Sequence, residues 1–174
     1  MFPVLETERL ILREITAEDA NAIFSCFSDE RVTEHYGSEP FQNIEEAMTL
    51  IENFSVNFQE KRTIRWGIEL KNNKELIGTL GFHAWARKHK KAEIGYEIHP
   101  DHWRKGYASE AIDKVIEYGF NMMDLTRIGA VIYLENKASY KLLEKLGFQR
   151  EGILRKNMYQ NGIAHDTYVY SKLK

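Results

Sequence analysis

The stretch His99-Pro-Asp-His-Trp-Arg-Lys-Gly-Tyr-Ala-Ser-Glu-Ala111 joins a segment with strand character to a segment with helical periodicity. The segment after it carries apolar residues at spacings of three and four between Ala111 and Met123, which is typical of a helix. The first turn of a helix has unpaired backbone N–H groups and a partial positive charge, to which Arg104 and Lys105 add two cations. Gly106 lets an anion approach the backbone closely. The stretch therefore predicts a site for a pyrophosphate-type ligand.

The length and composition of the chain are those of a single-domain globular protein. Its 174 residues are enough for one domain with a substantial core, and we expect a single domain over residues 1–174. The formal net charge of −2 does not favour a nucleic-acid partner, which would want a strong basic excess. The lone cysteine, Cys26, the absence of an apolar run long enough to cross a bilayer and the absence of a signal-like N-terminus favour a cytoplasmic protein without a membrane partner.

Hydrophobic periodicity predicts alternating helices and strands along the chain. The order of elements indicates an α/β (α+β) fold, with a mixed, mostly antiparallel seven-stranded sheet and helices on both faces. Gly106 follows the end of a strand, where such sheets place their ligands. The predicted strands span about 10–15, 64–70, 76–85, 92–98, 127–134, 148–158 and 164–170, and the predicted helices begin near Thr16, Asn43, Gly106 and Asn136.

Several phrases of the sequence occur together, in an order and at spacings that are specific. They are Leu5-Glu-Thr-Glu-Arg-Leu-Ile-Leu-Arg13, Ile77-Gly-Thr-Leu-Gly81, Glu93-Ile-Gly-Tyr96, Trp103-Arg-Lys-Gly-Tyr-Ala-Ser-Glu-Ala111, Asn136-Lys-Ala-Ser139 and Glu144-Lys-Leu-Gly-Phe148. Through them the chain resembles the GCN5-related N-acetyltransferase (GNAT) superfamily over nearly its whole length. Within that superfamily it resembles the RimJ/RimL-like enzymes that acetylate the N-termini of ribosomal proteins.

The resemblance implies an acetyl-CoA-dependent N-acetyltransferase that transfers the acetyl group directly to an amine. We expect no metal site, because His99 and His102 are separated by Pro100 and have no further clustered ligands. The pyrophosphate of CoA would lie on residues 104–109, and the pantetheine arm along the strand that ends at Ile98, which would splay from its neighbour. Trp103 departs from the glutamine or arginine usual three residues before the glycine, although many Rim-like members share the tryptophan. The residues expected to bind the cofactor are Ile98, Arg104, Lys105, Gly106, Tyr107, Ala108, Ser109, Asn136, Ser139 and Tyr140.

Attack of the acceptor amine on the thioester of acetyl-CoA requires a neutral amine. We therefore expect a general base near the thioester. Strand alternation places Glu93 and Glu97 on one face. Glu93 is the preferred base, because a glutamate on this strand has that role in histone-acetylating members and because partial desolvation would raise its pKa. Glu97 and a water relay are the alternatives. A backbone N–H near Glu97 and Ile98 would stabilise the oxyanion.

The leaving thiolate needs a proton, and Ser139 is the predicted acid. It lies one helical turn after Asn136, which can cap the helix and, by resemblance, bind the pantetheine arm. In Rim-like enzymes the serine of this Asn-x-x-Ser phrase approaches the thiol sulfur, and Tyr140 is the alternative acid. The glutamate that Rim-like enzymes carry just before the last hairpin turn is replaced here by Met158, which leaves that mechanism in doubt.

The sequence gives the least information about which amine accepts the acetyl group. We expect an α-amine of a protein or peptide; the alternatives are a small amine, such as a polyamine or an aminoglycoside, and a non-catalytic CoA-binding module. An acidic cleft would favour a polycation, whereas an open groove would favour a peptide. Homodimers are frequent among similar proteins. Residues considered for the acceptor side are His35, Tyr36, His83 and Trp85, and those that would make the cleft acidic are Glu34, Glu39, Glu45, Glu46 and Glu93.

Overall fold

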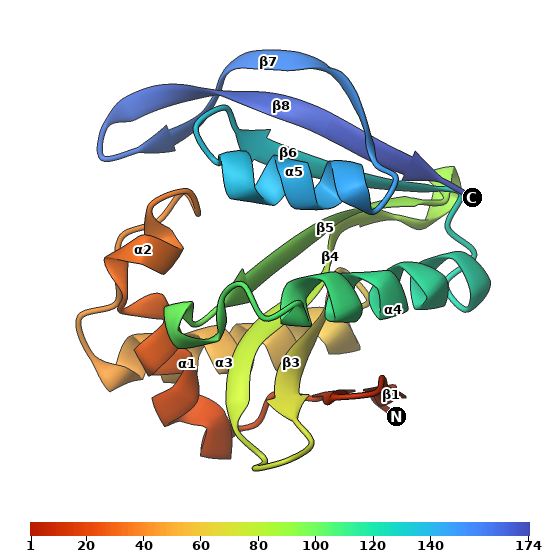
Figure 1. Ribbon diagram of the computed structural model, residues 1–174. Helices are drawn as coiled ribbons and strands as arrows, with labels where there is room; N and C mark the ends of the chain where they lie inside the picture. The colour runs from red at the N-terminus through yellow and green to blue at the C-terminus, as the bar shows by residue number, and fades with distance from the viewer.

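The computed structural model describes all 174 residues and contains one eight-stranded sheet (Figure 1). The strand order is β1-β2-β3-β4-β5-β6-β8-β7, and every neighbouring pair is antiparallel except β5 and β6, which run parallel. The strands are β1 (Leu5–Glu6), β2 (Leu10–Arg13), β3 (Ile64–Leu70), β4 (Leu76–Ala86), β5 (Lys91–Ile98), β6 (Arg127–Tyr133), β7 (Gln149–Gln160) and β8 (Ile163–Leu173).

The predicted mixed sheet is confirmed, with two small additions. β1 is a two-residue strand that the alternation pattern did not reveal, and the short helix α2 (Glu30–Thr33) lies between the helices predicted to begin near Thr16 and Asn43. The longer helices are α1 (Ala20–Phe27), α3 (Ile44–Gln59), α4 (Tyr107–Asn121) and α5 (Lys137–Lys145). None of the helices combines the length and the apolar character that a membrane span requires.

The helices cover both faces of the sheet, as predicted. On one face, α4 packs over β3 and β4, where Trp66 contacts Tyr118 with ring centroids 5.4 Å apart and Phe82 lies against the bare backbone of Gly119. On the other face, α1 and α3 enclose a smaller apolar cluster that includes Ile23 and Phe27. The two faces of the central strands therefore have different surroundings.

Polar caps define the start of two helical segments. A 3-10 helix (Ala17–Asp19) leads into α1, and the backbone N–H of Thr16 just before it donates to the carboxylate of Asp19 at 2.8 Å. At α3, the side chain of Asn43 accepts from the N–H of Glu46, and the carboxylate of Glu46 accepts in return from the N–H of Asn43, both at 3.2 Å. These reciprocal bonds satisfy N–H groups that a helix leaves without partners.

Candidate active site

The loop before α4 presents a run of free backbone N–H groups. Arg104 and Gly106 both adopt left-handed backbone conformations, with φ of 59° and 82°. The N–H groups of residues 104–106 donate no hydrogen bond within the protein. Those of residues 107–109 form the first turn of α4 and have no intrahelical acceptor. Six consecutive amides at the positive end of a helix suit the diphosphate of a nucleotide.

The N-terminal segment holds this loop in place. Glu110, in the first turn of α4, accepts hydrogen bonds from Thr7 Oγ1 at 2.5 Å and from Arg9 Nε at 2.7 Å. Arg9 also donates to the carbonyl of Lys105 at 2.9 Å, and its guanidinium lies 4.5 Å from the ring centroid of Tyr107. Burial acts to raise the pKa of Glu110, but these donors outweigh it, and the pKa is lowered. Glu110 is therefore an anchor of the loop.

β5 and β6 form a V-shaped opening, as the resemblance implied. They pair only over residues 91–93 and 127–129 and then diverge (Figure 1). The N–H of His99 donates to Ile77 on the β4 side at 2.8 Å, so the alternation of strand N–H groups directs the N–H of Ile98 toward the opening. The carbonyl of Ile98 faces the same way and accepts from the Trp103 indole at 2.6 Å. Trp103 thus ties the loop to the end of β5.

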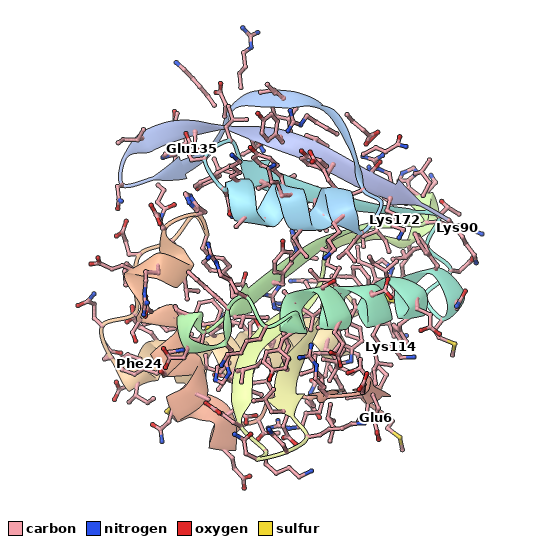
Figure 2. All side chains as sticks on the ribbon, viewed as in Figure 1. Glu6, Phe24, Lys90, Lys114, Glu135 and Lys172 are labelled. Atoms are coloured by element: carbon pink, nitrogen blue, oxygen red, sulfur yellow. The ribbon has the colours of Figure 1, made fainter.

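A cavity of about 1300 Å³ runs from the start of α4 through this opening. Figure 2 shows Lys90 and Lys172 at the closed end of the V and Glu135, which lines the cavity, at the open end. Of the residues predicted to bind the cofactor, Lys105 and Tyr140 do not line the cavity. The others do: Ile98, Arg104, Gly106, Tyr107, Ala108, Ser109, Asn136 and Ser139.

Ser139 meets a partner that the sequence analysis did not identify. Asn136 caps α5 as predicted, its side chain accepting from the N–H of Ser139 at 3.3 Å. The Ser139 hydroxyl lies 2.5 Å from the hydroxyl of Tyr96 on β5. Burial raises the pKa of Tyr96 to about 12, so the phenol stays protonated. Either hydroxyl can donate in this contact; when Tyr96 donates, the Ser139 O–H is free to point into the cavity that Ser139 lines.

Other residues considered from the sequence lie elsewhere. Tyr140 packs on the far side of α5, in contact with Tyr168 and Tyr170, and is therefore placed away from the opening. Trp85 lies under Arg87, whose guanidinium is 4.3 Å from the indole ring, and does not line the cavity. No cluster of three or more histidine, cysteine or carboxylate side chains forms that could hold a metal ion.

On the α1–α3 face of the sheet, Glu97 is already paired. Its carboxylate forms an ion pair with Arg65, and it accepts from the Thr79 hydroxyl at 3.0 Å. The side chains of Glu97 and Arg65 are only 7% and 10% exposed. A buried carboxylate that is neutralised in this way is poorly suited to taking a proton from a substrate. The geometry therefore argues for a structural role of Glu97.

Glu93 lies on the same face and lines the cavity, but its pKa differs from the prediction. His83 Nε2 is 3.3 Å from the Glu93 carboxylate, and this contact lowers the pKa of Glu93 more than burial raises it. The expectation of a raised pKa is therefore wrong. Sequence reasoning considered His83 only as a cleft residue, although the β4–β5 hairpin register places it directly opposite Glu93.

Comparison with known proteins agrees with this geometry. A family model described as an acetyltransferase (GNAT) domain matches residues 9–149. The chain therefore belongs to the GNAT acetyltransferase family. It is an N-acetyltransferase whose acetyl donor is acetyl-CoA, and the free amides before α4 and the opening between β5 and β6 fit that donor.

Three matches indicate how close its relatives are. The chain is 60% identical to YoaA, an uncharacterised N-acetyltransferase from Bacillus subtilis, over 174 residues that cover 100% of this chain and 98% of YoaA. A crystal structure of a GNAT acetyltransferase from Bacillus anthracis superposes with a TM-score of 0.87 at 31% identity, covering 98% of each chain. Spermidine N(1)-acetyltransferase from Vibrio cholerae is 27% identical over 158 residues, which cover 91% of this chain and 89% of that enzyme.

Proposed function

We propose that this enzyme acetylates the α-amino group of a protein or peptide. The observation that carries the proposal is the weak negative charge on the acceptor side of the cavity. Of the five glutamates that would have formed an acidic cleft, only Glu34 and Glu93 line it, and Glu93 is paired with His83. Glu97 also lines the cavity, but its ion pair with Arg65 neutralises it. Such a site offers little to a polyamine, which carries several positive charges.

The donor would be held by backbone groups on the α4 side of the sheet. The amides of residues 104–109 suit the pyrophosphate, and the N–H of Ile98 faces the opening where the acetyl oxygen would gain negative charge. The amine would attack the thioester directly. Cys26 offers no alternative nucleophile, because it is buried in α1 and burial raises the pKa of its thiol to about 12.

Two proton transfers accompany the attack. The amine must lose a proton, and the candidate base on the acceptor side is the Glu93 region or a water molecule ordered there. The departing thiolate must gain one, and Ser139 supplies it. The Tyr96 hydroxyl holds Ser139 in place from inside the protein.

A small amine is the second candidate acceptor, and one structural feature favours it. The Gln160 side chain donates to the carbonyls of Thr33 and Ser38 at 2.7 and 3.2 Å and accepts from the N–H of Gly37 at 3.3 Å. These bonds fasten the segment after α2, which carries the cavity-lining residues His35 and Tyr36, to the β7–β8 hairpin. The similarity to a spermidine acetyltransferase points the same way.

A transfer assay with thiol detection distinguishes these acceptors. Purified protein is given acetyl-CoA and one of four amines: a short peptide with a free N-terminus, the same peptide with that terminus acetylated, spermidine, or an amino sugar. We expect kcat/KM for the free peptide to exceed that for spermidine at least tenfold, and no transfer to the blocked peptide. A preference for spermidine or the amino sugar would overturn the peptide assignment. CoA binding without thiol release for any amine would favour a binding module.

A further inference from the structure

His83 and Glu93 form a pair at the point where the sheet opens. They are directly opposite each other in the β4–β5 register, and Glu93 is the last residue of β5 that still pairs with β6, opposite Gly129. Both side chains line the cavity and are about half exposed, at 49% and 40%. The pair therefore lies at the vertex of the V, on the face of the sheet opposite Ser139.

The orientation of the imidazole leaves one ring nitrogen available. Nε2 faces the Glu93 carboxylate at 3.3 Å. The other side of the ring lies over Gly95: a Cβ built there would be 3.3 Å from Cε1 and 3.6 Å from Nδ1 of His83. Since residue 95 has no side chain, nothing from β5 covers Nδ1. A carboxylate 3.3 Å from Nε2 favours the tautomer that carries the proton there, whose Nδ1 has a lone pair.

The Glu93 carboxylate and the His83 imidazole differ in how readily they accept a proton. The carboxylate of Glu93 is ionised and a weak proton acceptor, because its contact with His83 lowers its pKa. A neutral imidazole nitrogen is a stronger proton acceptor than such a carboxylate, which suits it to take the proton that an attacking amine releases. The other charged groups on this side are Arg65 paired with Glu97, Lys91 and Arg127 near Glu93, and Glu34 and His35 on the segment after α2.

We propose that His83 is the general base of the transfer and that Glu93 is its positioning residue; this rests on the proposed function. The amine lone pair forms a bond to the acetyl carbon, and Nδ1 of His83 takes the proton released from the nitrogen. The carbon–sulfur bond breaks, and the thiolate leaves with the electron pair and takes the Ser139 proton. Ser139 regains a proton from solvent in the cavity, and His83 returns its proton to solvent.

Four variants test the proposal: His83→Gln, Glu93→Gln, the double variant, and His89→Gln as a matched control. His89 lies in the same hairpin but outside the cavity. With the free peptide as acceptor, we expect His83→Gln to lower kcat about 100-fold and to abolish the acidic limb of the kcat–pH profile, which reports groups of the enzyme–substrate complex. Glu93→Gln should move that limb to lower pH, and the double variant should be no worse than His83→Gln. CoA affinity should stay within twofold throughout, and the control should match the wild type.

Two outcomes would overturn the assignment. If the acidic limb persists in His83→Gln while Glu93→Gln loses more activity, Glu93 is itself the base. If neither variant changes the limb, a water relay suffices. NMR of the His83 ring nitrogens separates this result from a wrong acceptor: their chemical shifts should change in Glu93→Gln whichever amine the enzyme uses, and unchanged shifts would refute the pairing. If spermidine proves to be the acceptor, the same series is judged with spermidine.

Discussion

The buried ion pair between Arg65 and Glu97 is the feature whose removal should be felt most strongly. Replacing Arg65 with Met would leave the Glu97 carboxylate 7% exposed, with the Thr79 hydroxyl as its one remaining donor. Breaking one side of a buried pair costs about 3–5 kcal/mol, because an uncompensated charge stays inside the protein. For a chain of 174 residues, about 2–4 °C per kcal/mol converts this into a fall in Tm of about 6–20 °C.

Urea and thermal unfolding of three proteins measure the effect. These are Arg65→Met, the double variant Arg65→Met/Glu97→Met, and Arg62→Met as a matched control. Arg62 pairs with Glu60 in solvent, with 69% of its side chain exposed, and its loss should cost less than about 1 kcal/mol. The double variant should recover most of the stability, because two apolar side chains replace both charges.

Activity of the double variant decides the role of Glu97. If Glu97 is structural, the double variant should keep kcat/KM within about tenfold of the wild type. If Arg65→Met lowers the free energy of unfolding by less than about 1 kcal/mol, the claim that Arg65 neutralises a buried charge is refuted. A double variant that is stable but inactive would restore Glu97 as a candidate base.

Three further predictions concern the donor side. Reversing the charge at Arg104 and Lys105 should weaken CoA binding and reduce its dependence on salt, as measured by calorimetry; equal affinity would contradict the phosphate assignment. Tyr96→Phe should lower kcat about tenfold, with CoA affinity unchanged, because Ser139 loses its hydrogen-bond donor; a change in affinity alone would contradict this. The lowered pKa of Glu110 means that its contribution to stability is complete above its unfolded pKa of about 4.5 and is lost as the pH falls through the folded value. Glu110→Gln should therefore flatten the acid side of a stability–pH curve, and a parallel curve would contradict this.

The fold was predictable where one stretch of sequence decides the structure. The periodicity of α3 and α4 and the seven longer strands are local patterns, so the sequence alone located them. β1 escaped because it spans two residues and exists only through its pairing with β2. α2 escaped because four residues are too few to show a helical period.

The site was predictable where its groups are neighbours in the chain. The loop at residues 104–109 uses consecutive amides, and Asn136 and Ser139 are one helical turn apart. The contacts that set proton chemistry are not local: Tyr96 meets Ser139 only because α5 packs above β5. The direction of the Glu93 pKa was missed for the same reason, since it depends on the register of a hairpin with an irregular pairing between His83 and Ala86.

The alternation of β5 has one further consequence for the reaction. Glu93, paired with His83, points to the α1–α3 face, whereas Tyr96, paired with Ser139, points to the α5 face. A proton acceptor and a proton donor on opposite faces of one strand need the amine and the thioester to meet through the opening between β5 and β6. Both substrates must then be bound before the acetyl group moves. Initial-rate kinetics should give intersecting lines, because parallel lines would require an acetylated enzyme that this arrangement does not support.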